Sequence, residues 1–283
     1  MSFENIAVFG AGTMGHGIAQ VCAQAGISVT LYDIDDEKVN AGLARIQNNL
    51  NKGIEKGKVT PEGAEAALEL LTGTTELAVA ADGAEMLIEA IPEKLAWKQA
   101  LFSSLDPLAE PGAIFATNTS SISISTIAES VSDPSRVIGT HFFNPVFIMK
   151  LLEVVYHPGT GNDVLDAVLR FGARIGKECI SVRNAPGFAT SRLGVCLGME
   201  AIRMLEEGVA SAEDIDKSMV LGYRHKMGPL KLTDLVGLDV RMNIGEYLAK
   251  ELNNPAFEPP ELMRKLVAEG KLGQKSREGF YRW

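Results

Sequence analysis

Short apolar runs alternate with longer helix-periodic stretches over the first 183 residues of the chain. Short runs rich in β-branched side chains are typical of strands, and apolar residues spaced three or four apart are typical of amphipathic helices. Alternation of the two predicts βαβ units and a mostly parallel sheet. Strands are expected at residues 6–10, 28–33, 86–91, 113–118, 136–141, 150–156 and 178–182, and helices at residues 14–25, 36–57, 61–71, 93–105 and 162–175.

Residues 36–71 differ from an ordinary connection between two parallel strands. They hold a long, polar helical pattern, whereas a plain crossover needs only about a dozen residues. The stretch NKGIEKGKVTPEG interrupts this pattern with glycines and a proline, which predicts a turn. We therefore expect a helical hairpin that projects from the sheet and contributes nothing to a core.

The pattern changes at the segment RNAPGFATSR, residues 183–192. Beyond it the chain has no convincing strand pattern. Helix-periodic runs such as RLGVCLGMEAIRMLEEG, SAEDIDKSMV and DVRMNIGEYLAKEL follow, most of them separated by Gly or Pro, and Ser211 is placed to cap the second run. The sequence predicts an α/β fold with a doubly wound sheet at residues 1–183, followed by an all-α C-terminal domain at residues 184–283.

Composition narrows the class of protein. The formal net charge of −9 and the pI near 5.1 disfavour a surface for nucleic acid or anionic membrane. No apolar run approaches the roughly 20 residues that span a bilayer, and the segment MSFENIAVFG lacks the basic region of a signal peptide. The cysteines, Cys22, Cys179 and Cys196, are far apart and form no CxxC pair. We expect a cytoplasmic protein with reduced thiols, no metal site, and no nucleic-acid or membrane partner.

A glycine motif follows the first predicted strand. In VFGAGTMGHGIAQ, Gly10, Gly12 and Gly15 form GxGxxG at the start of the first helix. Such glycines allow a tight turn, a close approach of the backbone to a pyrophosphate, and close packing of helix on strand. The free N–H groups of the helix N-terminus then face the phosphates. A tight turn without a ligand is the alternative. The strand–turn–helix context favours a Rossmann-type NAD-binding domain, with Gly10, Ala11, Gly12, Thr13, Met14 and Gly15 as cofactor contacts.

Asp33 ends the second predicted strand, where a carboxylate accepts hydrogen bonds from the adenosine ribose hydroxyls. The acids that follow it would repel the 2′-phosphate of NADP, and no arginine lies nearby in the sequence to receive that group. We therefore expect NAD rather than NADP. For Asp36 and Glu37 the simpler interpretation is favourable charge in the first turn of the next helix.

His141 and Glu153 form the second candidate site. His141 ends a predicted strand, at the sheet edge where α/β proteins bind ligands, and Glu153 lies within the apolar strand KLLEVVY. Taken alone, His141 would more often be a structural residue, and Glu153 could point into water from an edge strand. A buried carboxylate, however, is costly unless it is paired. A histidine on the neighbouring strand is its natural partner, and together they would make a general base with an orienting acid.

At this point the sequence resembles the short-form 3-hydroxyacyl-CoA dehydrogenases over essentially its whole length. The resemblance is carried by the motifs GAGTMGHGIAQ, EAIPEKLAWK, TNTSSISI, GTHFFNPVFIMKLLEVV, APGFATSRL and LGQKSREGFY. It implies that His141 is the general base and Glu153 its orienting acid. It also assigns residues to three further sites. These are Ser120 and Asn144 at the substrate and nicotinamide, Glu93, Lys98 and Lys275 at the cofactor, and Asn49 and Lys56 at coenzyme A.

Two of these assignments have alternatives in the sequence itself, and one further position departs from the family pattern. Lys52, Lys56 and Lys58 could be a solvated basic face, and TNTSSISIST could be a hydroxyl-rich turn that caps a helix near residue 124. Many family members have asparagine where this chain has Ser191, whose side chain has a shorter reach, so Ser191 is only a candidate contact to substrate.

The expected function is NAD-dependent interconversion of (S)-3-hydroxyacyl-CoA and 3-oxoacyl-CoA, with 3-hydroxybutyryl-CoA as the preferred substrate. The resemblance also implies a homodimer formed through the helical domain. One rival is a dehydrogenase of free β-hydroxy or sugar acids, which would not need Lys56 or the hairpin. A non-catalytic dinucleotide-binding structural protein is another, although it would need neither His141 nor Glu153.

Overall fold

A computed structural model describes residues 3–283 of the chain. The chain divides into two compact units, one that ends at Asn184 and one that extends from Ala185 to Trp283. We call them the sheet unit and the helical unit, and each is described by itself.

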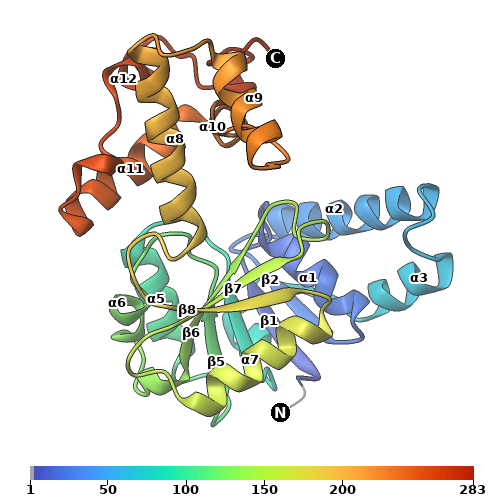
Figure 1. The fold of residues 1–283 in the computed structure, drawn as a ribbon. Helices are drawn as coiled ribbons and strands as arrows, with labels where there is room; N and C mark the ends of the chain where they lie inside the picture. Colours follow the sequence, from blue (N-terminus) through green and yellow to red (C-terminus); the bar gives the residue numbers. More distant parts are fainter. Residues whose placement is uncertain (1–2) are drawn as a thin grey trace. The chain divides into compact units, whose positions relative to one another are not determined.

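The sheet unit is built on one eight-stranded sheet with the strand order β3-β2-β1-β4-β5-β6-β7-β8 (Figure 1). Every neighbouring pair is parallel except β6 and β7, which are antiparallel. The chain passes from β1 outward through β2 to β3 and then crosses back to β4 on the other side of β1, so the expected doubly wound topology is confirmed. The strands are β1 (Asn5–Phe9), β2 (Ser28–Tyr32), β3 (Leu71–Thr74), β4 (Met86–Glu89), β5 (Ile114–Thr117), β6 (Val137–Phe142), β7 (Leu151–Tyr156) and β8 (Glu178–Arg183).

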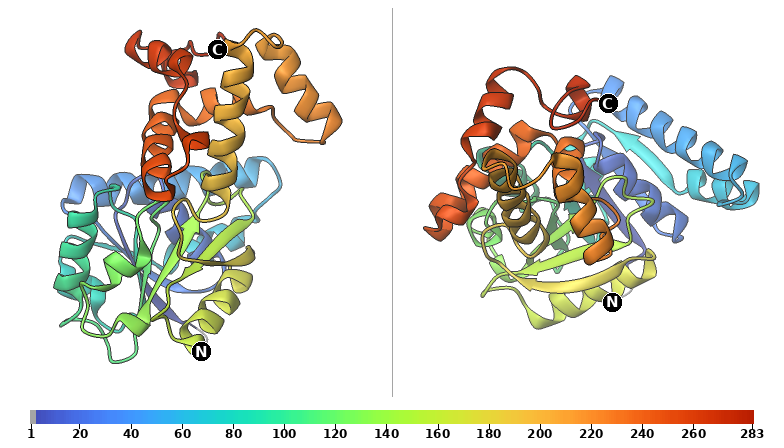
Figure 2. Two further views of the ribbon diagram at one scale, coloured as in Figure 1. Left: turned by 60° about the vertical axis from the view of Figure 1, so that its left-hand side comes forward. Right: turned by 45° about the horizontal axis from the view of Figure 1, so that its top comes forward.

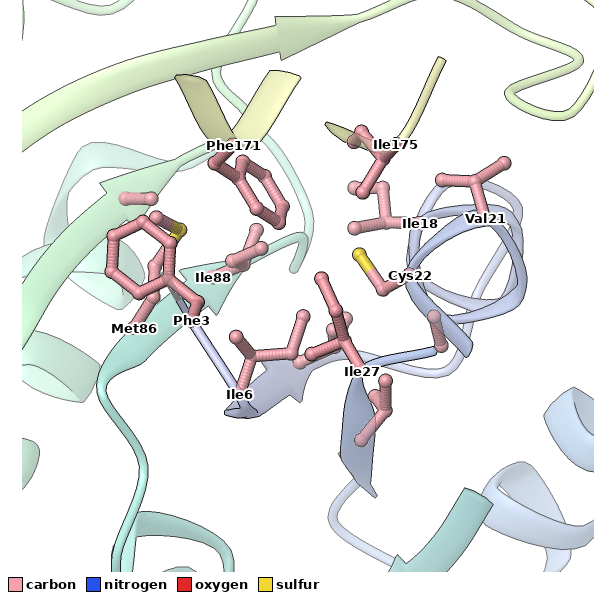
Figure 3. Packing of buried hydrophobic residues seen from close by; sticks show 14 of the residues in the cluster. Phe3, Ile6, Ile18, Val21, Cys22, Ile27, Met86, Ile88, Phe171 and Ile175 are labelled. Atoms are coloured by element: carbon pink, nitrogen blue, oxygen red, sulfur yellow. The ribbon is translucent and has the colours of Figure 1, made fainter. Parts of the chain in front are cut away.

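Helices cover both faces of this sheet. Alternate residues of β5 divide between them: Ile114 and Ala116 join a core with α1 and α7, whereas Phe115 contacts Phe102 of α5 at 5.2 Å between ring centroids. Figure 3 shows the first core closely, with Ile18 of α1 and Phe171 of α7 packed over the strands. The helices are α1 (Gly15–Gln24), α2 (Asp36–Glu55), α3 (Pro61–Glu69), α4 (Leu77–Ala81), α5 (Leu95–Leu105), α6 (Ile124–Ala128) and α7 (Asn162–Arg174), with a 3-10 turn at Pro134–Arg136.

Two short elements of the sheet unit were not predicted. The sequence pattern ended a helix at residue 71, but Leu71–Thr74 is strand β3, the edge strand beside β2. Its four residues, LTGT, carry no apolar alternation, and only pairing with β2 makes them a strand. A Cβ on Gly73 would lie 2.5 Å from Val39 of α2, so this glycine lets the hairpin pack closely on the strand. Helix α4, LAVAA, is too short to show a period.

The predicted helical hairpin is formed by α2 and α3, which extend away from the sheet in Figures 1 and 2. The expectation that it contributes nothing to a core was wrong. Ile46 and Leu50 of α2 are fully buried and join the cluster that contains α1, as do Ala64 and Ala67 of α3. The correction follows from the amphipathic pattern of α2, whose apolar stripe faces α1 while its remaining sides are polar.

The helical unit has its own core, which includes Met199, Ile202, Leu230 and Leu248. Ser211 caps α9, as predicted, by accepting a hydrogen bond from the N–H of Asp214 at 3.1 Å. Its helices are α8 (Thr190–Glu206), α9 (Ala212–Gly222), α10 (Pro229–Val236), α11 (Leu238–Leu252) and α12 (Glu261–Ala268). Between residues 3 and 283, no helix is both long and apolar enough to cross a membrane.

Candidate active site

The glycine turn connects β1 to α1 at the carboxyl edge of the sheet. Gly10 has a φ of +104°, and a Cβ there would lie 2.7 Å from the carbonyl oxygen of Ala90. A Cβ on Gly15 would lie 1.6 Å from the carbonyl oxygen of Gly10. A Cβ on Gly12, by contrast, would meet nothing within 4 Å. The protein itself therefore requires glycine at Gly10 and Gly15, whereas the open space at Gly12 fits the approach of a pyrophosphate.

Asp33 lies directly beside this turn. One carboxylate oxygen accepts a hydrogen bond from the N–H of Ala11 at 2.8 Å, and the other accepts from the N–H of Ile34 at 2.8 Å. Each carboxylate oxygen can accept a second hydrogen bond, so the group can hold the turn and a ribose hydroxyl together. Asp36 and Glu37 lie in the first turn of α2, as expected of charges that complement the helix dipole.

A buried ionic network lies beneath the turns after β4 and β5. Lys98, with a side chain only 1% exposed, donates to Glu89 at 2.7 Å and pairs with Glu93 at 3.1 Å. The hydroxyl of Thr117 donates to Glu89 at 2.6 Å. Burial raises the pKa of Glu89 despite the nearby ammonium. Loss of Lys98 or of Glu89 would leave a buried charge without its closest partner, so each of the two holds the other in place.

Glu93 organises the hydroxyl-rich turn of TNTSSISI. Burial acts to raise its pKa, but Lys98 and the hydrogen bonds outweigh burial and hold the pKa below its ordinary value. One oxygen accepts from the hydroxyl of Thr119 at 2.5 Å, from the N–H of Ser120 at 2.9 Å and from the N–H of Ser121 at 3.2 Å. Ser123 caps α6 through the N–H of Thr126, so the alternative interpretation as a capping turn is confirmed for this serine.

His141 and Glu153 lie directly opposite each other on β6 and β7. Nδ1 of His141 lies 2.7 Å from the carboxylate of Glu153. The carboxylate is fully buried and His141 is 7% exposed, so the interpretation of Glu153 as a solvated edge residue is wrong. A carboxylate can only accept, which assigns the Nδ1 proton to the imidazole. The pair has the arrangement of a general base with an orienting acid.

The segment after His141 turns back toward β7. The ring of Phe143 lies 4.5 Å from the imidazole between centroids, and the backbone N–H of Phe142 donates to the side chain of Asn118 at 2.9 Å. Asn144 is exposed and precedes Pro145 through a cis peptide bond. Asn144 lies three residues after His141 along the chain and two residues beyond the end of β6.

The candidate coenzyme A residues lie on the hairpin. The side-chain amide of Asn49 donates to Gln20 of α1 at 3.1 Å, so Asn49 helps to join α2 to α1. Lys52 lies in the last turn of α2, and Lys56 is its exposed C-terminal cap. Lys58 follows in the exposed turn before α3. The positive charge of this lysine cluster is complementary to the negative charge of nucleotide phosphates.

Lys275 and Ser191 belong to the helical unit. The ammonium of Lys275 donates to the carboxylate of Asp239 at 2.6 Å. Ser191 lies in the first turn of α8. Their expected contacts to cofactor and substrate stay predictions.

Two side chains of the site were missed by the sequence analysis. Glu89 is a carboxylate within the apolar run MLIEAI, which is the same signal that singled out Glu153. The amide of Asn118 holds the end of β6, and it gave no signal beyond its place at the carboxyl end of β5. In the described part of the chain, His, Cys, Asp and Glu side chains form no group suited to a metal ion.

Comparison with known proteins bears on both units. The family model for the 3-hydroxyacyl-CoA dehydrogenase NAD binding domain matches residues 5–185, and the model for the C-terminal domain matches residues 187–283. A probable 3-hydroxybutyryl-CoA dehydrogenase of Bacillus subtilis is 41% identical over 281 residues, which cover 99% of this chain and 98% of the relative. A 3-hydroxybutyryl-CoA dehydrogenase of Mycobacterium tuberculosis is 40% identical, with coverage of 99% and 98%. The crystal structure of (S)-3-hydroxybutyryl-CoA dehydrogenase from Ralstonia eutropha has a TM-score of 0.96 at 39% identity, covering 100% of this chain and 99% of that chain.

Proposed function

The chain belongs to the 3-hydroxyacyl-CoA dehydrogenase family, and from this premise we propose that it interconverts (S)-3-hydroxybutyryl-CoA and acetoacetyl-CoA with NAD(H). The pairing of His141 with Glu153 carries this proposal. A dinucleotide-binding protein without catalysis has no physical need for a buried carboxylate held against an imidazole. The names of its relatives support the short-chain substrate.

In the proposed mechanism, bound NAD supplies the acceptor for the hydride that leaves C3 of the alcohol. Because Nδ1 of His141 donates to Glu153, Nε2 takes the hydroxyl proton as the C3 carbonyl forms. Glu153 keeps the ring oriented and stabilises the imidazolium that results. In the opposite direction His141 returns the proton to the oxygen.

The remaining residues bind and orient. We propose that Ser120 and Asn144 donate hydrogen bonds near the reacting oxygens, and that Glu93 fixes the turn that carries Ser120. Lys98 is buried against Glu89 and Glu93, so its proposed contribution to the cofactor site includes the orientation of Glu93.

The cofactor and coenzyme A are held by separate parts of the chain in this proposal. Gly10, Ala11, Gly12, Thr13, Met14 and Gly15 bind the pyrophosphate and Asp33 binds the ribose, while Lys275 is a further proposed cofactor residue. Asn49, Lys56 and Ser191 contact the acyl-CoA. The sheet unit thus acts as the NAD-binding domain. It ends at Asn184, one residue beyond the end expected from the sequence.

We further propose that the protein is a cytoplasmic homodimer joined through its helical unit. Support comes from large apolar side chains that this unit exposes, among them Leu193, Leu221 and Tyr223. Burial of these side chains against a second copy would be favourable.

The test is NADH oxidation measured with acetoacetyl-CoA and with free acetoacetate, each for the unaltered protein and for His141→Ala. We expect turnover of the thioester alone, inhibited by free coenzyme A. His141→Ala should lower kcat by roughly 10²–10⁴ while NADH binding is nearly retained, because a general base acts in the transition state. Equal turnover of acetoacetate, or a His141→Ala variant with most of its kcat, would contradict the proposal.

A further inference from the structure

Lys177 is a buried cation outside the residues assigned so far. It connects α7 to β8 and is only 9% exposed. Its ammonium donates hydrogen bonds to the carbonyl oxygen of Val146 and, at 2.8 Å, to that of Met149. Both carbonyls belong to the segment PVFIM, residues 145–149, which follows Asn144. We call this segment the Pro145 turn.

The Pro145 turn is fixed from two sides. Its backbone N–H groups at Ile148 and Met149 donate to the carbonyl oxygen of Pro145 at 3.0 and 2.9 Å, which closes one helical turn. Val146 is buried, and a Cβ on Gly17 of α1 would lie 2.9 Å from its Cβ. The turn is therefore packed against α1 at Gly17, which follows the glycine motif in the sequence, while Lys177, directly before β8, binds the turn from another side.

Burial of an ammonium group at this position costs more free energy than burial of an apolar side chain that would only fill the space. Across residues 3–283 the hydrogen-bond acceptors of Lys177 are the two carbonyl oxygens, and no carboxylate pairs with it. Burial accordingly lowers the pKa of Lys177. An apolar side chain would fill the space without desolvating a charge. What the ammonium adds is a directional hold on two points of the turn that follows Asn144.

We propose that Lys177 is a positioning residue for the dehydrogenase reaction, because it holds the Pro145 turn and so fixes the backbone that presents Asn144. The proposal rests on the proposed role of Asn144 at the substrate and nicotinamide. Asn144 is exposed and lies outside the strands, so its position depends on the anchor at each end. One end is the terminus of β6, and the other is the turn that Lys177 binds.

The first experiment compares Lys177→Met with the unaltered protein in the reduction of acetoacetyl-CoA by NADH. Enzyme concentration is taken from the stoichiometry of NADH binding, so unfolded protein does not count. We expect kcat to fall roughly 10- to 100-fold, since a displacement of about 1 Å in a reacting group can cost about a hundredfold. The Kd of NADH should change by less than about twofold, because the glycine turn and Asp33 are left in place.

Lys150→Met is the matched control. Lys150 lies directly after the Pro145 turn, but its side chain is 78% exposed and faces Glu178 at 3.8 Å. Lys150→Met therefore removes a positive charge next to the Pro145 turn without removing a hydrogen bond to its backbone. This variant should retain the kcat of the unaltered protein. Lys177→Arg, which keeps the donors and the charge, should recover part of the kcat that Lys177→Met loses.

A double-variant cycle separates positioning from general stabilisation. If Lys177 acts through Asn144, Lys177→Met added to Asn144→Ala should lower kcat by less than about twofold beyond Asn144→Ala alone. The proposal would be overturned if the fold-losses in kcat of the two single variants multiplied in the double variant. It would also be overturned if Lys177→Met kept its kcat while Asn144→Ala lost activity. Either result would leave the proposed function intact. Unaltered kcat in Asn144→Ala would instead overturn the role of Asn144, and this proposal with it.

Discussion

At the scale of single residues, the proposed chemistry depends on the charge of one buried carboxylate. Glu153 is fully buried and 2.7 Å from Nδ1 of His141. Replacement by Gln keeps the size of the side chain but removes the negative charge that stabilises the imidazolium. We expect Glu153→Gln to lower kcat by about 10²–10⁴ with little change in the KM of either substrate.

Glu178→Gln is the control for that measurement. Glu178 is a carboxylate on the adjacent strand β8, with a side chain 79% exposed, and it should tolerate the same change with its kcat retained. A Glu153→Gln variant that only raised KM would assign the carboxylate to substrate binding rather than to orientation of the imidazole.

Asp33 is expected to set the choice between NAD and NADP. Asp33→Ser should weaken NAD⁺ binding and narrow the preference over NADP⁺, because the carboxylate both binds ribose hydroxyls and repels a 2′-phosphate. The structure adds a second cause of weaker binding, since the carboxylate also accepts from the N–H of Ala11. Measurement of kcat/KM for the two cofactors checks the prediction, and an unchanged ratio would assign discrimination to another residue.

The sequence predicted the individual residues of the site better than their connections. Glu153 was found because a carboxylate within an apolar strand needs a partner. Glu89, in MLIEAI, presents the same signal, but its partner Lys98 lies nine residues away on α5 rather than on a neighbouring strand. Lys177 gave no signal at all. A lysine beside a glycine is ordinary at the end of a helix, and only the packed structure places its ammonium against the Pro145 turn.

At the scale of secondary-structure elements, the hairpin of α2 and α3 combines two roles. Ile46 and Leu50 anchor it in the core beside α1, whereas the lysines at its far turn are exposed. The helices of this hairpin were predicted from the sequence, but neither the buried apolar stripe of α2 nor the strand that follows α3 was predicted. Strand β3 has neither length nor apolar alternation, and it exists because β2 offers an unpaired edge. Such pairing is a property of the folded sheet.

Lys56 tests the proposed role of this hairpin. Lys56→Glu should raise the KM of acetoacetyl-CoA roughly two- to fivefold, more than Lys56→Ala, because an exposed charge contact is weak and reversal adds repulsion. The effect should be larger at low salt, since exposed charges are screened over about 10 Å at 0.1 M. NADH affinity and the midpoint of thermal unfolding should barely move, because Lys56 lies outside the buried stripe of α2.

A truncated substrate that lacks the nucleotide portion of coenzyme A provides the control. The KM of this truncated substrate should not change in Lys56→Glu. Equal damage to both substrates would mean that the hairpin does not bind coenzyme A, and a dehydrogenase of free β-hydroxy acids would then gain support.

At the scale of the whole molecule, both units expose large apolar side chains, among them Ile34 at 72% and Ile148 at 64% in the sheet unit. The family resemblance assigns the proposed dimer interface to the helical unit. The helical unit exposes Leu193, Leu221 and Tyr223 at 72%, 73% and 76%. These side chains are in contact with water in a monomer. Their burial against a second copy would favour association.

The proposed homodimer can therefore be tested by sedimentation. The protein should sediment at about twice its chain mass of 30.4 kDa. Higher salt should not dissociate the dimer, because salt screens the repulsion between two chains of charge −9 but does not weaken apolar burial. The triple variant Leu193→Asp, Leu221→Asp and Tyr223→Asp should sediment as a monomer. Val79→Asp, at an exposed apolar position of the sheet unit, should remain a dimer. A triple variant that stays dimeric would place the interface elsewhere, and a monomeric unaltered protein would contradict the dimer itself.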